Sequence, residues 1–82
     1  EKKFILNSKG VIIAEGNQNI KDLYKKFDLD LPEIESSTIA GHVMDLAKKI
    51  PMYGETIKDN KFNYKITSHS RKQILRLEIT KI

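Results

Sequence analysis

The stretch that decides the fold is Thr38-Ile39-Ala40-Gly41, which is followed by Ile50-Pro51 and then by Gly54-Glu55. The hydroxyl of Ser37 or Thr38 can accept a hydrogen bond from the first free amides of a helix, and Pro51 cannot continue a helix. The sequence therefore predicts a helix that begins after Thr38 and ends before Pro51, with a turn at Gly54. One apolar stripe at helical spacing supports this helix: Ile39, Val43, Leu46, Ala47 and Ile50.

Gly41 lies inside this predicted helix, where glycine costs about 1 kcal/mol relative to alanine. Such a position is usually explained by the close approach of another element. We therefore expect the Gly41 face to be buried, where the first helix or the sheet crosses this helix.

Two strands and a short helix are predicted before this point. The runs Phe4-Ile5-Leu6 and Val11-Ile12-Ile13-Ala14 have strand composition, and Asn7-Ser8-Lys9-Gly10 predicts a hairpin turn between them. A helix is then predicted from an N-cap at Asn19 to about Asp28, with an apolar face made of Ile20, Leu23, Tyr24 and Phe27. Because Pro32 disfavours a helical residue before it, an extended link should join the two helices.

The C-terminal third returns to the two-residue period of strands. A short strand is predicted at residues 55–58, and two half-buried strands follow, separated by a hairpin loop at residues 68–72. Their inward residues are predicted to be Phe62, Tyr64 and Ile66 in the first strand and Leu75, Leu77 and Ile79 in the second. Because the neighbours Ile74 and Leu75 are both apolar, we also expect a bulge there or burial of Ile74 under the loop.

The predicted order is β-β-α-α-β-β-β, which favours an α+β fold with a small antiparallel or mixed sheet and both helices on one face. With 82 residues, 39% hydrophobic and 32% charged, the chain has the composition of one small globular domain, residues 1–82. No apolar run approaches the roughly 20 residues that span a bilayer. We interpret the chain as a domain excised from a longer protein, because it opens on Glu1-Lys2-Lys3-Phe4 without an initiator methionine.

The order and spacing of these segments resemble the CorC/HlyC transporter-associated domain. The resemblance covers nearly the whole chain and is carried by Asp30-Leu31-Pro32, Thr38-Ile39-Ala40-Gly41, Ile50-Pro51, Gly54-Glu55, Phe62 and Ile74-Leu75-Arg76-Leu77. Its structural motif residues here are Thr38, Ala40, Gly41, Pro51 and Gly54. Two positions depart from the family pattern: Tyr24 stands in place of a small polar residue, and Asn60 in place of a turn glycine.

This resemblance implies a fold similar to a subdomain of flavoprotein FAD-binding modules. It also implies an accessory domain on the cytoplasmic side of a membrane protein, after a membrane-spanning domain and a pair of cystathionine-β-synthase-type regulatory domains. Such proteins are linked to Mg²⁺ and Co²⁺ efflux or are called haemolysin-like. The implied role is regulation of ion transport through contact with neighbouring domains or through self-association, without direct insertion into the membrane.

No sequence motif indicates a catalytic site or a bound cofactor. The chain has no cysteine, which excludes disulfides and thiolate nucleophiles, and its four glycines fit neither a dinucleotide fingerprint nor a phosphate loop. An FAD-like fold therefore brings no FAD site with it. His42 is expected at the surface or half-buried, and Ser68-His69-Ser70 is not expected to form a catalytic pair. We predict a non-enzymatic module with no cofactor.

Two charged regions remain as candidate sites. The acidic link carries Asp28, Asp30, Glu33 and Glu35, which are weak candidates for a Mg²⁺ site, although their spacing matches no EF-hand loop and a solvated link is favoured. The chain has a net charge of +4, and its basic end supplies the candidate interaction residues Lys58, Lys61, Lys65 and Arg76.

Two alternative functions stay open. One is a module that senses a cation or an anionic metabolite at the acidic link or the basic sheet. The other, less favoured, is nucleic-acid binding, because Phe62 and Tyr64 are expected to point into the core and not to serve as stacking platforms.

Overall fold

The computed structural model describes residues 4–6, 9–31 and 33–82. The elements are β1 (Ile5–Leu6), β2 (Ile12–Glu15), α1 (Ile20–Lys26), α2 (Ile39–Ala47), β3 (Thr56–Lys58), β4 (Phe62–His69) and β5 (Ile74–Lys81). The predicted order and the α+β class are confirmed. Asn7, Ser8 and Pro32, on which parts of the first turn and of the link were predicted, lie outside the described residues.

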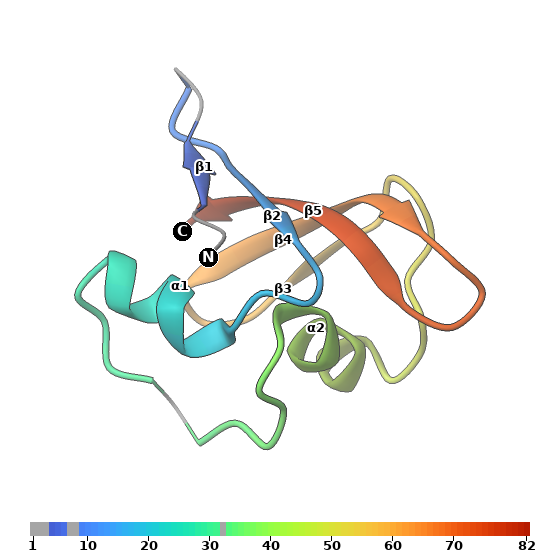
Figure 1. Cartoon of the computed structure of the whole chain (residues 1–82), viewed down its shortest axis with the longest axis horizontal. Coiled ribbons are helices and arrows are strands. Elements are labelled where there is room, and N and C mark those ends of the chain that lie inside the picture. Colours follow the sequence, from blue (N-terminus) through green and yellow to red (C-terminus); the bar gives the residue numbers. More distant parts are fainter. Residues whose placement is uncertain (1–3, 7–8, 32) are drawn as a thin grey trace.

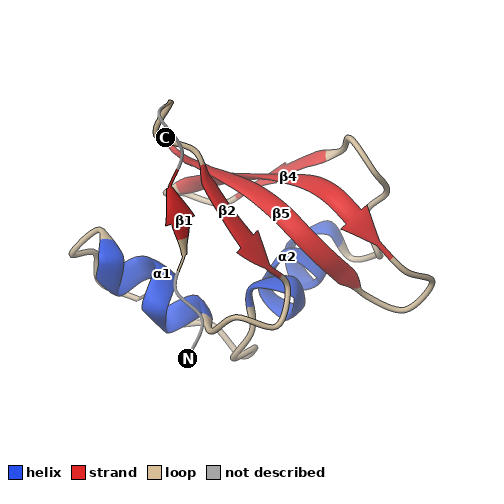
Figure 2. Ribbon diagram, turned by 45° about the horizontal axis from the view of Figure 1, so that its top comes forward, coloured by secondary structure: helices blue, strands red, loops and turns tan. Residues whose placement is uncertain are grey.

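The strands form one sheet in the order β1-β2-β5-β4-β3, and every pairing is antiparallel. Both helices lie on the same side of this sheet, as predicted, and no helix of the described residues lies on the other side (Figures 1 and 2). We call the uncovered side the open face.

The predicted caps set the beginnings of both helices. The side chain of Asn19 accepts a hydrogen bond from the Lys21 amide at the start of α1, and the Thr38 hydroxyl accepts one from the Gly41 amide at the start of α2. The end of α2 comes earlier than predicted, because Lys48 adopts a left-handed conformation with φ of 59°. Ile50 therefore lies outside the helix and Leu46 is 39% exposed, so the apolar stripe was wrong in its C-terminal half.

The core lies between the helices and the inner face of the sheet. It consists of Ile12, Ala14, Ile20, Leu23, Tyr24, Ile39, Ala40, Val43, Phe62, Tyr64, Ile66, Ile74, Leu77 and Ile79. The prediction that Phe62, Tyr64 and Ile66 point inward is confirmed.

The predicted irregularity in the last strand is confirmed. Ser68 pairs with Arg76 and His69 pairs with Ile74, so Leu75 is an extra residue on β5. Ile74 is consequently buried and Leu75 is 42% exposed. The prediction that Leu75 shares the inward face with Leu77 was wrong, because the bulge turns it outward.

Two glycines would meet neighbouring atoms if they carried a Cβ, Gly16 and Gly41, and the role of Gly41 differs from the one predicted. A Cβ atom on Gly41 would lie 2.9 Å from the Cβ and Oγ atoms of Ser36, so the segment that closely approaches this glycine is the link before α2. The expectation that the first helix or the sheet crosses at Gly41 was wrong. The tight crossing is at Gly16, where a Cβ atom would lie 2.9 Å from the Cβ atom of Ala40 and against the carbonyl group of Ile74.

Gly16 joins three elements through its backbone. Its amide donates to the carbonyl of Leu75 at 2.9 Å, and its carbonyl accepts from the amide of Ala40 at 2.9 Å. The small motif residue Ala40 is buried at this crossing. The two predicted turn glycines, Gly10 and Gly54, have positive φ angles of 80° and 86°, as expected for turns.

Candidate functional site

The most densely bonded polar group in the described part of the chain is the carboxylate of Asp59, in the turn between β3 and β4. Its Oδ1 atom accepts hydrogen bonds from the backbone amides of Lys61 and Phe62, each at 2.8 Å. Aspartate commonly bonds amides two and three residues ahead in this way and so fixes its own turn. Asn60 takes no positive φ angle here, so the turn needs no glycine at that position.

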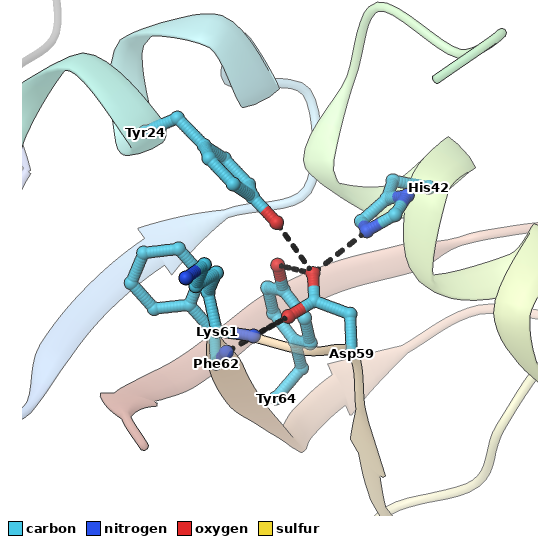
Figure 3. Close-up of polar contacts among 6 residues, drawn as sticks. All are labelled: Tyr24, His42, Asp59, Lys61, Phe62 and Tyr64. Atoms are coloured by element: carbon cyan, nitrogen blue, oxygen red, sulfur yellow. Dashed lines mark hydrogen bonds and ion pairs between the residues drawn. The ribbon is translucent and has the colours of Figure 1, made fainter. Parts of the chain in front are cut away.

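The Oδ2 atom of Asp59 receives hydrogen bonds from three other side chains (Figure 3). The hydroxyl of Tyr64 on β4 lies at 2.7 Å, the Nε2 atom of His42 on α2 at 2.9 Å, and the hydroxyl of Tyr24 on α1 at 3.0 Å. One oxygen atom therefore connects both helices to the sheet. We call these four residues, Tyr24, His42, Asp59 and Tyr64, the Asp59 cluster.

Electrostatics fix which groups donate. Burial alone would raise the pKa of the Asp59 carboxyl, but hydrogen bonds from His42, Tyr64 and the two amides outweigh it and hold this pKa well below its usual range. Burial, together with the Asp59 charge, raises the pKa of both Tyr24 and Tyr64 far above the ordinary value. Asp59 is therefore ionised and the phenols are neutral. Since an ionised carboxylate can only accept, Nε2 of His42 carries a hydrogen.

Aromatic packing holds these side chains in place. The Tyr24 and Phe62 rings pack edge to face with their centroids 5.2 Å apart, and the His42 and Tyr64 rings pack edge to face with their centroids 5.9 Å apart. Contacts of this geometry contribute about 0.5–1.5 kcal/mol each beyond the area they bury. The hydrogen bonds of the Asp59 cluster are therefore surrounded by packed aromatic rings between the helices and β4.

The geometry of the Asp59 cluster is better suited to holding the helices on the sheet than to catalysis. Asp59 accepts five hydrogen bonds from groups of the chain itself, which occupies the lone pairs of a carboxylate. His42 is buried, so the expectation that it lies at the surface or half-buried was wrong. Sequence reasoning also missed Asp59, whose one local signal was an aspartate directly after a short strand.

The acidic link shows no assembled metal site. Asp28, Asp30, Glu33 and Glu35 are all exposed. Within residues 4–6, 9–31 and 33–82, no three histidine, aspartate or glutamate side chains are grouped so that they could hold a metal ion. A hollow beside α2 is lined by Glu33, Glu35, Asp45 and His42 among others, but the Asp45 carboxylate already accepts a hydrogen bond from Ser36 at 2.7 Å.

The four basic candidates divide into two pairs. Lys58 and Lys61 lie in or beside the β3–β4 turn and are exposed. Lys65 and Arg76 are exposed on the open face, where Lys65 pairs with Glu78 across the strands and Arg76 with Glu15. The open face is therefore mixed in charge, whereas the turn presents two lysines together.

Two large apolar residues precede the Gly54 turn and point into solvent. Met52 is 61% exposed and Tyr53 is 75% exposed. The Met52 amide donates to the Glu55 carboxylate at 3.2 Å, and Lys49 donates to the same oxygen at 3.0 Å, so this turn is fixed by the chain itself. Exposed aromatic residues on a fixed turn are frequent at protein interfaces.

Comparison with known proteins gives a consistent result. The family model for the transporter-associated domain, CorC_HlyC, matches residues 6–82. The inner membrane protein YfjD of Escherichia coli is 23% identical over 70 residues, which are 85% of this chain and 16% of that protein. The chain thus spans only a small part of this curated relative, and no helix in the described ranges is both long and apolar enough to cross a bilayer.

Solved structures share the fold. A conserved protein of unknown function from Haemophilus influenzae has a TM-score of 0.86 with 23% identity and covers 99% of this chain and 100% of its own. A CorC_HlyC domain from Nitrosomonas europaea has a TM-score of 0.85 with 19% identity, over 100% and 99% of the two chains. A CorC_HlyC domain of a Xylella fastidiosa hemolysin, in complex with Mg²⁺ and Mn²⁺, has a TM-score of 0.81 with 19% identity, over 96% of each.

Proposed function

Because the chain belongs to the transporter-associated domain family, CorC/HlyC, we propose that it is a non-catalytic regulatory module of a membrane ion transporter that works by contact with neighbouring domains. Its partners in this proposal are a membrane-spanning domain and regulatory domains of the same protein, on the cytoplasmic side of the membrane. Mg²⁺ or Co²⁺ is the proposed transported ion. Self-association of the domain is a further proposed mode of contact.

The observation that carries this proposal is that the hydrogen-bonded Asp59 cluster lies inside the domain, whereas the candidate contact residues lie on its surface. Three members of the Asp59 cluster, Tyr24, His42 and Tyr64, are buried, and the Asp59 side chain is 9% exposed. Its carboxylate already accepts five hydrogen bonds from the chain, which argues against a role in binding a substrate. The surface near the Gly54 turn instead presents Met52 and Tyr53, and the next turn presents Lys58 and Lys61. The two turns lie at opposite ends of β3, so they present an apolar contact and a basic contact at two separate places. Both kinds of residue are common in docking surfaces.

The proposal is tested in the full-length transporter reconstituted into vesicles. We expect deletion of the domain, and the double charge reversal Lys65→Glu with Arg76→Glu, to change ion flux or its regulation. The isolated variant domain should stay folded, although each reversal faces a glutamate across the strands and should cost up to about 1 kcal/mol. The matched control is Arg71→Glu, which reverses an exposed charge in the β4–β5 loop. Flux and assembly that are indifferent to both the charge reversal and the deletion would remove the basis of the proposal.

A cation-sensing module is the second candidate, and the hemolysin domain in complex with Mg²⁺ and Mn²⁺ is the observation that favours it. The exposed, ungrouped carboxylates of the acidic link argue for weak and diffuse attraction of cations in this chain. We therefore predict no tight Mg²⁺ site at Asp28, Asp30, Glu33 and Glu35. Calorimetric titration with Mg²⁺ checks this, and saturable micromolar binding abolished by Asp30→Asn would establish the second candidate.

A further inference from the structure

The β3–β4 turn has two sides that are adjacent in sequence and opposite in orientation. Lys58 and Lys61 are exposed, whereas Asp59 between them points inward to the two helices (Figure 3). The turn that presents a pair of basic residues is thus held from the inside by side chains of α1 and α2.

One rigid group links the turn to the helices. The Oδ1 atom of Asp59 accepts the Lys61 and Phe62 amides and so shapes the turn, while Oδ2 accepts Tyr24 and His42 from the helices. Because a carboxylate is planar and rigid, a movement that shifts its Oδ2 partners also rotates Oδ1 away from the two amides. The loss of alignment weakens those hydrogen bonds steeply.

We propose that the Asp59 carboxylate couples the positions of α1 and α2 to the conformation of the basic β3–β4 turn. An acidic partner that binds Lys58 and Lys61 and displaces the turn then also loosens the helices, and a change at the helices alters how the two lysines are presented. The use of this coupling in docking rests on the proposed function. The coupling itself is a property of the chain alone and is tested without a partner.

A second physical link between α1 and β4 must be kept constant in the test. The Tyr24 ring packs on the Phe62 ring at 5.2 Å, so a truncation of Tyr24 would change packing as well as hydrogen bonding. Tyr24→Phe removes only the hydroxyl and keeps this ring contact. Tyr53→Phe is the matched control, because it removes the hydroxyl of an exposed tyrosine that is 75% accessible.

The experiment measures amide hydrogen exchange by NMR in the parent chain and in both variants. We expect Tyr24→Phe to speed the exchange of the Lys61 and Phe62 amides about tenfold or more. The variant loses the hydrogen bond from the Tyr24 hydroxyl to the charged Oδ2 atom, so the carboxylate can turn away from the two amides. The amides of Gly16 and Ser70, which bond the carbonyls of Leu75 and Gln73 and belong to neither helix, serve as internal references and should change much less. The Tyr53→Phe control should leave all four rates unchanged.

A second variant tests the other helix. His42→Leu removes the Nε2 donor of α2 and should raise the same two rates, Lys61 and Phe62, even if its overall stability falls. The coupling is wrong if the turn amides keep their rates in both variants, or if the Gly16 and Ser70 amides accelerate by the same factor, which would indicate global destabilisation. Neither result bears on docking, and a failed charge-reversal experiment would leave the coupling untouched.

Discussion

At the scale of single residues, the structure assigns the close crossing to Gly16 and not to Gly41. A glycine inside a helix draws attention because its cost is known, whereas a glycine after a strand looks like an ordinary turn residue. The decisive neighbours of Gly16 are the Ile74 carbonyl and Ala40, which are 58 and 24 positions away in the chain. No local pattern announces contacts at that separation.

Gly16→Ala should lower the free energy of unfolding by about 1–3 kcal/mol, because the added methyl group would meet the backbone of β5 and the buried Ala40. Urea unfolding measures this loss. Gly41→Ala is the comparison: its added methyl group would meet the side chain of Ser36, which is partly able to move, and the helix gains propensity. A loss at Gly41 equal to or greater than the loss at Gly16 would contradict the assignment.

At the scale of elements, most of the fold could be predicted from local signals. Asn19 and Thr38 marked both helix beginnings, and the alternation of Phe62, Tyr64 and Ile66 marked the inner face of β4. The end of α2 could not be predicted in the same way, because Lys48 adopts its left-handed conformation without a glycine. The adjacent Ile74 and Leu75 indicated a bulge, but only the register shows which of the two turns outward.

The candidate site was less predictable than the fold. The Asp59 cluster joins residues from α1, α2, the β3–β4 turn and β4. Each has an ordinary local explanation: an aromatic on a helix, a polar residue on a helix flank, an aspartate in a turn and an inward aromatic on a strand. Tyr24 had been singled out as a departure from the family pattern, and its hydroxyl bonds Asp59 35 positions away. The sequence marked Tyr24 as unusual but did not identify Asp59 as the residue that it bonds.

The Asp59 cluster should make stability depend on pH at both extremes. Because folding lowers the pKa of Asp59, its contribution is fully present above the unfolded-state pKa of about 4 and is lost as the pH falls below it. Because folding raises the pKa of Tyr24 and Tyr64, their contribution is present below the unfolded-state pKa of about 10 and is lost as the pH rises.

Urea midpoints measured between about pH 2 and pH 12 check both limbs. Asp59→Asn should flatten the acid limb and Tyr24→Phe the alkaline limb, each relative to the parent. Tyr53→Phe, which removes an exposed phenol, should leave the alkaline limb as it is. An Asp59→Asn profile parallel to that of the parent below pH 4 would contradict the role given to the carboxylate.

At the scale of the whole molecule, the helices and the core lie on one side of the sheet (Figure 2). Both edge strands are short, two residues in β1 and three in β3, and β3 carries the exposed Lys58. Short edges with a lysine resist pairing with another strand. Side chains near the Gly54 turn are therefore better suited than a bare strand edge to hold a partner.

The apolar residues at the Gly54 turn and the basic residues at the β3–β4 turn should affect docking in different ways. Buried apolar contacts mainly slow dissociation, whereas charges around an interface mainly speed association and make it depend on salt. In a surface-binding experiment against the remaining domains of the proposed transporter, the double variant Met52→Ser with Tyr53→Ser should therefore raise the dissociation rate about tenfold. The salt dependence of its binding should match that of the parent. Lys58→Gln with Lys61→Gln should slow association and flatten its salt dependence. Leu31→Ser, which changes an apolar residue that is 36% exposed in the acidic link, is the control for non-specific loss of surface hydrophobicity. If this control weakened binding as much as the Met52 and Tyr53 changes, the docking surface would lie elsewhere on the molecule.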